Sequence, residues 1–122
     1  MLPATARLTR SEDFRSVTRR GRRAGGSRIV VHALAEEVQT SASPRVGFVV
    51  SRAVGNSVVR HRVVRRLRHV VRDRLGTLPA GSSLIVRALP SAAEASSAEL
   101  RQDFDAALRR LRLRANNDGG ES

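Results

Sequence analysis

The sequence predicts a single α+β domain in two layers, with helices packed on a small sheet. The 122 residues are enough for one hydrophobic core but not for two. Strand-like runs and amphipathic helical patterns follow one another in the order helix, strands, helix, strand, helix. The helix in the middle of this order is very rich in arginine, and strand-like runs flank it on both sides. No internal repeat is visible, so one packed unit is the expected architecture.

The first element is a helix over residues 10–20. Thr9 precedes Glu12 by three residues, the spacing of a capping box that begins a helix. Residues 1–8 before it form a lead that we expect to be flexible. The buried side chains of this helix would be Phe14 and Val17.

Gly21 is the expected stop of the first helix. The segment that follows, GRRAGGS at 21–27, is predicted to be a basic, glycine-rich loop. It lacks the GxxxxGK[ST] spacing and precedes a strand rather than a helix, so it is not a phosphate-binding P-loop.

Three strands are predicted from apolar alternation or from apolar runs, at 28–35, 45–51 and 83–89. The third is almost wholly apolar, which favours an interior position in the sheet. Between the first two lies a polar, hairpin-like connection at 36–44. LPAGS at 78–82 is expected to be a turn.

The last element is a helix that begins at a second capping box, Ser96 to Glu99. Its core-facing residues would be Leu100, Phe104, Ala107, Leu108 and Leu111. The polar end of the chain, residues 115–122, is expected to be disordered. The folded domain is therefore predicted to span residues 9–114.

The arginine-rich helix lies within residues 51–74, which hold eight arginines and one acid, Asp73. Gly55-Asn56 is a turn signal, and Asn56 or Ser57 can cap the helix. At about 100° per residue, an apolar stripe faces one way and a cationic set faces the other. The stripe is Val59, Val63, Leu67 and Val70. The cationic set is His61, Arg65, Arg68 and Arg72, bordered by Arg62 and His69.

Composition indicates a polyanionic partner. The net charge of +12 comes from 23 arginines with no lysine. A merely solvated helix face is the alternative, but such faces usually mix charges of both signs. Phosphates pair bidentately with guanidinium groups and would offset the repulsion among these arginines.

Other features bound the protein class and its location. The absence of cysteine excludes disulfides and thiolate zinc sites and suits a reducing cytosol, so we expect a cytoplasmic protein. The chain start has no apolar signal region, and nowhere do 18 apolar residues run together. Secretion and membrane binding are therefore not expected.

No catalytic or metal-binding constellation is visible. A nuclease needs carboxylates that gather Mg²⁺, or histidine with an acidic or basic partner. The acids are scattered, and the three histidines have no constellation of acids adjacent to them in sequence. We expect no catalytic residue and no metal ligand in this chain.

The segment RVGFVVSRAVGNSVVRHRVVRRLR resembles the motif region of the bacterial ribonuclease P protein family, which follows a pattern like RVGLxVSKKxGNAVxRNRxKRxxR. The upstream segment RLTRSEDFRSVTRRG is similar to the first helix of that family. Together the resemblance covers residues 7–90, and the Gly-Asn pair with its spaced arginines makes it specific.

The resemblance implies a fold, a partner and an activity. The basic helix would form an unusual left-handed crossover between parallel strands, whereas the general rule favours a right-handed one. The protein would pair, one copy per RNA, with a large catalytic RNA that removes the 5′ leader from precursor tRNA by Mg²⁺-assisted hydrolysis. The protein would bind that RNA and hold the single-stranded leader.

By position, the resemblance assigns two sets of site residues. The RNA-binding residues are Arg52, Asn56, Arg60, His61, Arg62, Arg65, Arg66, Arg68 and Arg72. The leader-binding residues are Phe14, Thr18 and His32.

The sequence departs from the family pattern in both sets. His61 replaces an asparagine and Val64 a lysine, while Thr18 and His32 stand at positions that are commonly aromatic. The family's arginine shortly before the proline of the last strand aligns with Ala88. Arg87 lies one residue earlier, where the period of two would send its side chain to the other face of the sheet.

Two other functions share the basic helix. A ribosomal or RNA-assembly protein would bind a different RNA and serve no nuclease. A DNA-binding regulator of the helix-turn-helix class would need two helices joined by a short turn, and strand-like runs flank the basic helix instead.

Overall fold

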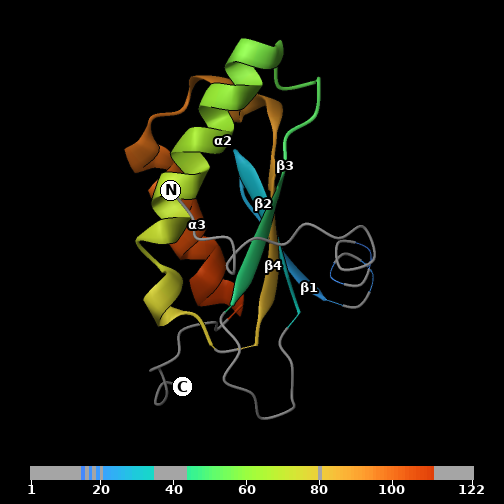
Figure 1. The fold of residues 1–122 in the computed structure, drawn as a ribbon, viewed down its shortest axis with the longest axis vertical. Helices are drawn as coiled ribbons and strands as arrows, with labels where there is room; N and C mark the ends of the chain where they lie inside the picture. The colour runs from blue at the N-terminus through green and yellow to red at the C-terminus, as the bar shows by residue number, and fades with distance from the viewer. Residues whose placement is uncertain are drawn as a thin grey trace.

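The computed structural model describes residues 15, 17, 19, 21–34, 44–79 and 81–111. They form a mixed four-stranded sheet with two long helices on one of its faces (Figure 1). The predicted α+β fold, with helices packed on a small sheet, is confirmed. The predicted lead at 1–8, the first capping box, Phe14 and the tail at 115–122 lie outside the described residues.

The sheet has the strand order β1-β2-β4-β3. Its strands are β1 (Arg22–Gly25), β2 (Ile29–Leu34), β3 (Arg45–Val49) and β4 (Ser83–Ala88). β2 pairs antiparallel with both β1 and β4, whereas β3 pairs parallel with β4. The expected interior position of the last strand is confirmed.

Two expectations about the sheet are wrong. The segment predicted to be a loop at 21–27 contains β1, which forms a hairpin with β2. Its sequence RRAG buries only Ala24, so the alternation was too weak to reveal a strand. The connection at 36–44 was expected to be hairpin-like, but β2 and β3 are not neighbours because β4 lies between them.

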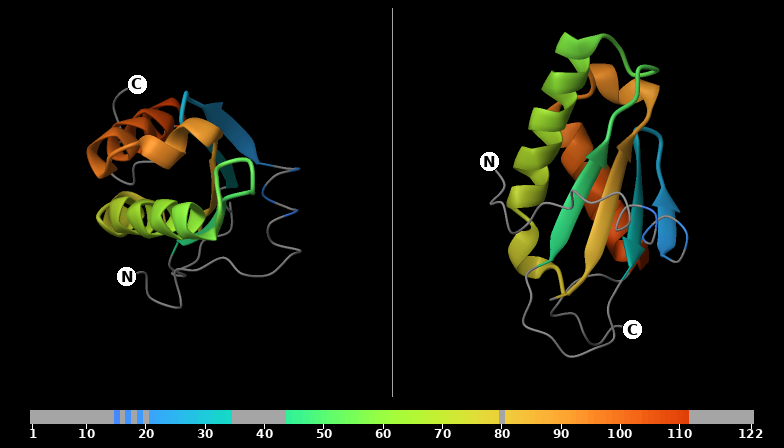
Figure 2. Two further views of the ribbon diagram at one scale, coloured as in Figure 1. Left: turned by 90° about the horizontal axis from the view of Figure 1, so that it is seen from above. Right: turned by 45° about the vertical axis from the view of Figure 1, so that its right-hand side comes forward.

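The connection from β3 to β4 runs through helix α2 (Ser57–Arg72). In the right-hand view of Figure 2, β3 points upward, β4 lies to its right and α2 lies behind the sheet. Because the two strands are parallel, this connection is left-handed, as the resemblance implied.

Helix α3 (Ser97–Leu111) lies beside α2 on the same face of the sheet (Figure 2). Two short 3₁₀ helices, η2 (Leu75–Thr77) and η3 (Pro90–Glu94), come between α2 and α3 in the chain. The main core fills the space between the two long helices and the sheet. Its fully buried side chains include Val31, Val63, Leu67, Val70, Val86, Leu100 and Phe104. Both predicted apolar stripes are therefore confirmed.

The predicted capping box of α3 is present. The Ser96 hydroxyl accepts a hydrogen bond from the Glu99 amide at 3.1 Å, and a Glu99 carboxylate oxygen accepts one from the Ser96 amide at 2.9 Å. The Ser96 amide, and after it the nearby Arg28 guanidinium, hold the pKa of Glu99 below its usual value. The cap thus fixes where α3 begins and orients its apolar face.

The opposite face of the sheet carries a smaller core. Val17 is buried there against Ile85 of β4. Arg15, Val17 and Arg19 are helical, in agreement with the predicted first helix. The Gly21 amide donates to the carbonyl oxygen of Val17 at 2.9 Å, and the chain then turns directly into β1. One helical segment therefore packs on the face that α2 and α3 leave open.

Candidate RNA-binding surfaces

The turn before α2 fixes where its basic residues start. The Asn56 side-chain oxygen accepts a hydrogen bond from the Val59 amide at 3.0 Å, so Asn56 rather than Ser57 is the cap of the two that the sequence allowed. A Cβ atom at Gly55 would lie 2.8 Å from Cγ1 of Val59. Glycine is needed there because the turn approaches the helix so closely. Asn56 therefore caps α2 and fixes where the helix begins.

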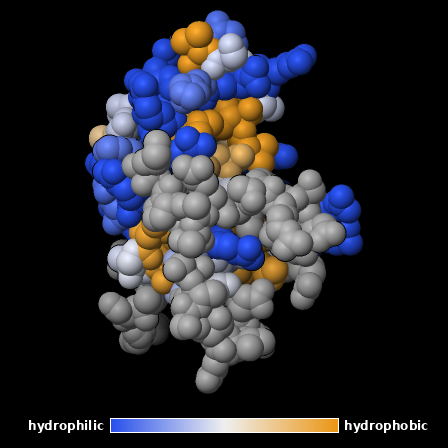
Figure 3. All heavy atoms as spheres, viewed as in Figure 1, coloured by the Kyte–Doolittle hydropathy of each residue, from blue (hydrophilic) through white to orange (hydrophobic). Residues whose placement is uncertain are grey.

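The surface of α2 that points away from the sheet is cationic, and we call it the basic face. Its residues are His61, Arg62, Arg65, Arg68 and Arg72. His61, Arg65 and Arg72 are exposed, whereas Arg62 and Arg68 are half-buried. Figure 3 shows strongly hydrophilic residues gathered along α2, on the left of the view. The structure thus brings together five of the predicted RNA-binding residues on one helix face.

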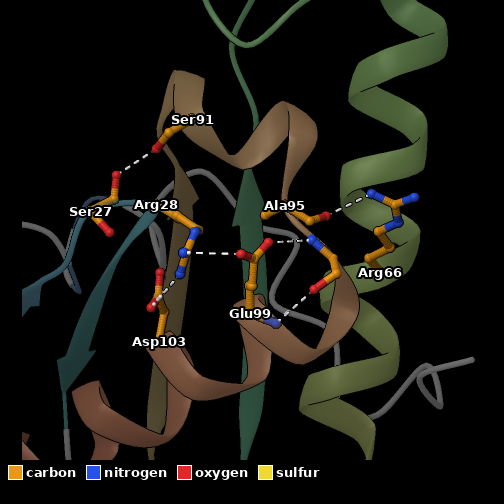
Figure 4. A network of polar contacts seen from close by, with 8 residues as sticks. Ser27, Arg28, Arg66, Ser91, Ala95, Glu99 and Asp103 are labelled. Atoms are coloured by element: carbon orange, nitrogen blue, oxygen red, sulfur yellow. Dashed lines mark hydrogen bonds and ion pairs between the residues drawn. The ribbon is translucent and has the colours of Figure 1, made fainter.

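The other predicted RNA-binding arginines have different surroundings. Arg52 is exposed in the turn before α2. Arg60 is half-buried, and its Nε atom has no hydrogen-bond partner. Arg66 donates from Nη1 to the carbonyl oxygen of Ala95 at 2.7 Å, so its guanidinium is turned toward α3 rather than toward the basic face (Figure 4).

Four of the five described carboxylates lie within 4.0 Å of an arginine that is not part of the basic face. Arg28 contacts Asp103 at 3.0 Å and Glu99 at 3.4 Å (Figure 4). Asp73 lies 4.0 Å from Arg101, and Arg74 contacts Asp105 at 2.7 and 2.8 Å. The fifth described acid is Glu94. Among the residues that the structure describes, no ion pair joins a carboxylate to the basic face.

An open hollow marks the N-terminal half of the basic face. It has a volume of about 530 Å³. Its described lining residues are Ser57, Val58, His61, Arg62 and Arg65. Two guanidinium groups, an imidazole, a hydroxyl and one apolar side chain therefore lie side by side along this part of α2.

A second cationic surface lies on the opposite face of the sheet, and we call it the sheet surface. It consists of Arg23, His32 and Arg87, from three adjacent strands. Arg23 pairs directly with His32, and Arg87 pairs with Val30, two residues from His32 on the same face. This arrangement places the predicted leader-binding residue His32 between two arginines. Phe14 and Thr18, the other predicted leader-binding residues, lie outside the described residues.

The environment of His32 favours its neutral form. Partial burial lowers the pKa of His32, and the positive charges of Arg87 and Arg23 lower it further. A bound phosphate would offset both charges and would therefore favour protonation. The sheet surface can thus couple anion binding to proton uptake.

Arg23 and Arg87 were absent from the residues predicted by sequence. Ala88, which aligns with the family's arginine, is buried in the main core, and Arg87 is exposed on the face that carries His32. The period of two had indicated that Arg87 faces away from Ala88, but not that this is the face of His32. Recognising Arg23 required the strand β1, which the sequence did not reveal.

The described residues contain no group of three or more histidine, aspartate and glutamate side chains that could hold a metal ion. None of the described helices is both long and apolar enough to cross a membrane. The chemistry that these residues offer is binding of anions by arginine and histidine.

A family model described as Ribonuclease P matches residues 2–112. The chain belongs to the ribonuclease P protein family. The ribonuclease P protein component of Streptomyces griseus is 55% identical over 117 residues, which cover 91% of this chain and 95% of the relative. That of Corynebacterium diphtheriae is 53% identical over 115 residues, covering 91% and 97%. The chain is thus a protein component of ribonuclease P, and the ribosomal and DNA-binding alternatives find no support.

Solved structures agree on the fold. The ribonuclease P protein of Staphylococcus aureus superposes with a TM-score of 0.77 at 21% identity, covering 88% of this chain and 96% of that one. The Thermotoga maritima protein gives a TM-score of 0.72 at 22% identity, covering 85% and 96%. At these identities the likeness concerns the fold of the ribonuclease P protein, not the individual site residues.

Proposed function

We propose that the basic face of α2 binds the catalytic RNA of ribonuclease P. The observation that carries this proposal is the separation of charge on the described surface. The described carboxylates lie on or near α3 and at the end of α2, most of them beside arginines, and none of them forms an ion pair with the basic face. Its arginines repel one another in the free protein. RNA phosphates would remove that repulsion and release counterions.

We further propose that the sheet surface holds the 5′ leader of precursor tRNA. The support is the position of His32 between Arg23 and Arg87, beside the helical segment that carries Arg15 and Arg19. His32 replaces an aromatic residue of the family pattern, and the described surface offers two guanidinium groups in addition. Leader binding would accordingly depend more on charge than on base stacking.

The two surfaces lie on opposite sides of the sheet, so one protein could contact the catalytic RNA and the leader at the same time (Figure 2). In this proposal one protein binds one RNA in the cytoplasm. The RNA, with its Mg²⁺ ions, hydrolyses the phosphodiester bond. The protein supplies positive charge that lowers the repulsion between two RNAs.

Reconstitution tests the proposal. The full-length protein is combined with ribonuclease P RNA and a precursor tRNA that carries a leader. Cleavage at low Mg²⁺ should need the protein. Because the protein and Mg²⁺ both supply positive charge, cleavage should depend less on the protein as the Mg²⁺ concentration is raised. The RNA-free protein should cut nothing. Cleavage by rigorously RNA-free protein, or a protein effect independent of Mg²⁺, would overturn the proposal.

A further inference from the structure

Val58 is an apolar residue in an otherwise cationic surface. It lies in the first turn of α2 and is 69% exposed, the only large hydrophobic residue so exposed in the described part of the chain. At 100° per residue, Val58 falls on the same line of α2 as Arg65, in the middle of the outward surface. Val58 lines the hollow beside His61 and Arg62, so one apolar side chain lies among cationic ones there.

The composition of the hollow distinguishes between two forms of RNA. An RNA duplex presents mainly phosphates and ribose hydroxyls to a protein, and arginines alone are sufficient for these. An unpaired nucleotide also presents the flat face of its base, which favours an apolar side chain and a planar ring. Val58 and His61 supply these two groups, and Arg62 supplies positive charge at the same hollow.

We propose that this hollow binds one unpaired nucleotide of RNA, with the base against Val58 and His61 and the adjoining phosphates on Arg62 and Arg65. The proposal rests on the proposed RNA-binding function of the basic face and names the kind of RNA element that this face receives. A segment in which a nucleotide is extruded from its helix would fit, whereas continuous duplex would leave Val58 without a partner.

The test compares three RNA probes with the full-length protein. They are a ten-nucleotide oligoadenylate, an RNA duplex of the same length and an abasic ribose–phosphate chain of that length. Val58→Thr keeps the shape of the side chain but replaces a methyl group by a hydroxyl. Loss of this methyl group should weaken oligoadenylate binding about fourfold, the effect of one buried methyl-sized group. Binding of the abasic chain should change by much less, since that chain has no base to lie on Val58.

Arg65→Gln separates this inference from the proposed function. It should weaken binding of all three probes and flatten their salt dependence, because it removes a phosphate contact. If Arg65→Gln has this effect but Val58→Thr weakens the three probes equally or not at all, the nucleotide site is refuted and the basic face stands. If Arg65→Gln changes none of the three, the RNA-binding function of the face fails with it. Circular dichroism melting of each variant shows whether a loss comes from unfolding.

Discussion

Arg66 of α2 donates a hydrogen bond from Nη1 to the carbonyl oxygen of Ala95, at 2.7 Å. Ala95 lies between η3 and α3, so this bond joins the helix that carries the basic face to the segment that leads into α3 (Figure 4). Arg66, which belongs to the predicted RNA-binding set, is thus hydrogen-bonded within the protein. The basic residues of α2 fall into two groups, one directed to α3 and one directed outward.

This division predicts the behaviour of Arg66→Gln. Loss of the bond to Ala95 should lower the free energy of unfolding by about 1 kcal/mol, the net value of a typical hydrogen bond. The slope of log affinity against log salt for the catalytic RNA should stay close to that of the parent. Arg65→Gln is the matched control. It should have little effect on stability but should flatten the slope of log affinity against log salt. A flattening by Arg66→Gln equal to that of Arg65→Gln would show that Arg66 contacts phosphate.

The close packing of Gly21 predicts a strong effect on folding. A Cβ atom there would lie 2.5 Å from the carbonyl oxygen of Val17 and 2.9 Å from the carbonyl carbon of Ala33, both backbone atoms. Because neither atom can move without shifting the helical segment or β2, Gly21→Ala should lower stability by about 1–3 kcal/mol. Gly76→Ala is the control, since a Cβ atom at Gly76 meets nothing within 4 Å. Equal urea midpoints for the two variants would contradict the described packing.

The sequence predicted the elements whose signals are local. The helix caps at Asn56 and Ser96 need only a few neighbouring residues, and the apolar stripes of α2 and α3 follow from the period of 3.6. The strand β1 was missed because its four residues bury a single side chain. The order of the strands was missed because pairing of β2 with β4 joins residues that are distant in sequence, from Leu34 with Ser83 to Ile29 with Ala88.

The candidate sites divide in the same way. The basic face could be predicted because one helix carries all of it. The sheet surface could not, because Arg23, His32 and Arg87 meet only through the register of three strands. The contact of Arg66 with Ala95 likewise depends on how α2 packs against α3.

The position of His32 predicts a pH effect on leader binding. The pKa of His32 lies below its usual value near 6.5, because of burial and of Arg87 and Arg23. Leader phosphates would raise it, so binding takes up a proton, and affinity for precursor tRNA should rise as pH falls from about 7.5 to 6. His32→Gln should lose this dependence. Mature tRNA, which has no leader, should show the same pH profile with both proteins.

The free protein should respond to pH with the opposite sign. Because the folded state binds the proton of His32 less readily than the unfolded state, stability should decrease as pH falls below about 6.5. His32→Gln should remove that part of the decrease, as measured by urea unfolding between pH 7.5 and 5.5. If the binding and stability profiles of the variant overlay those of the parent, His32 does not titrate as described.

The exposure of Arg87 predicts selective loss of leader binding. Arg87→Gln should weaken binding of precursor tRNA by the holoenzyme roughly tenfold, as expected for a lost charged contact. Binding of mature tRNA should be unaffected. Arg109→Gln, which removes the same charge from an exposed position on α3, is the matched control. Similar losses with both variants would mean that net charge, rather than the sheet surface, is responsible.

The basic face is proposed to contact phosphates of the catalytic RNA, and the salt dependence of binding measures this contact most directly. Affinity is determined at several salt concentrations for the parent, Arg62→Gln and Arg65→Gln, with folding checked for each. The slope of log affinity against log salt should flatten by about 0.7–0.9 for each arginine removed. Unchanged slopes in folded variants would contradict the claim and leave the basic face as a merely solvated surface.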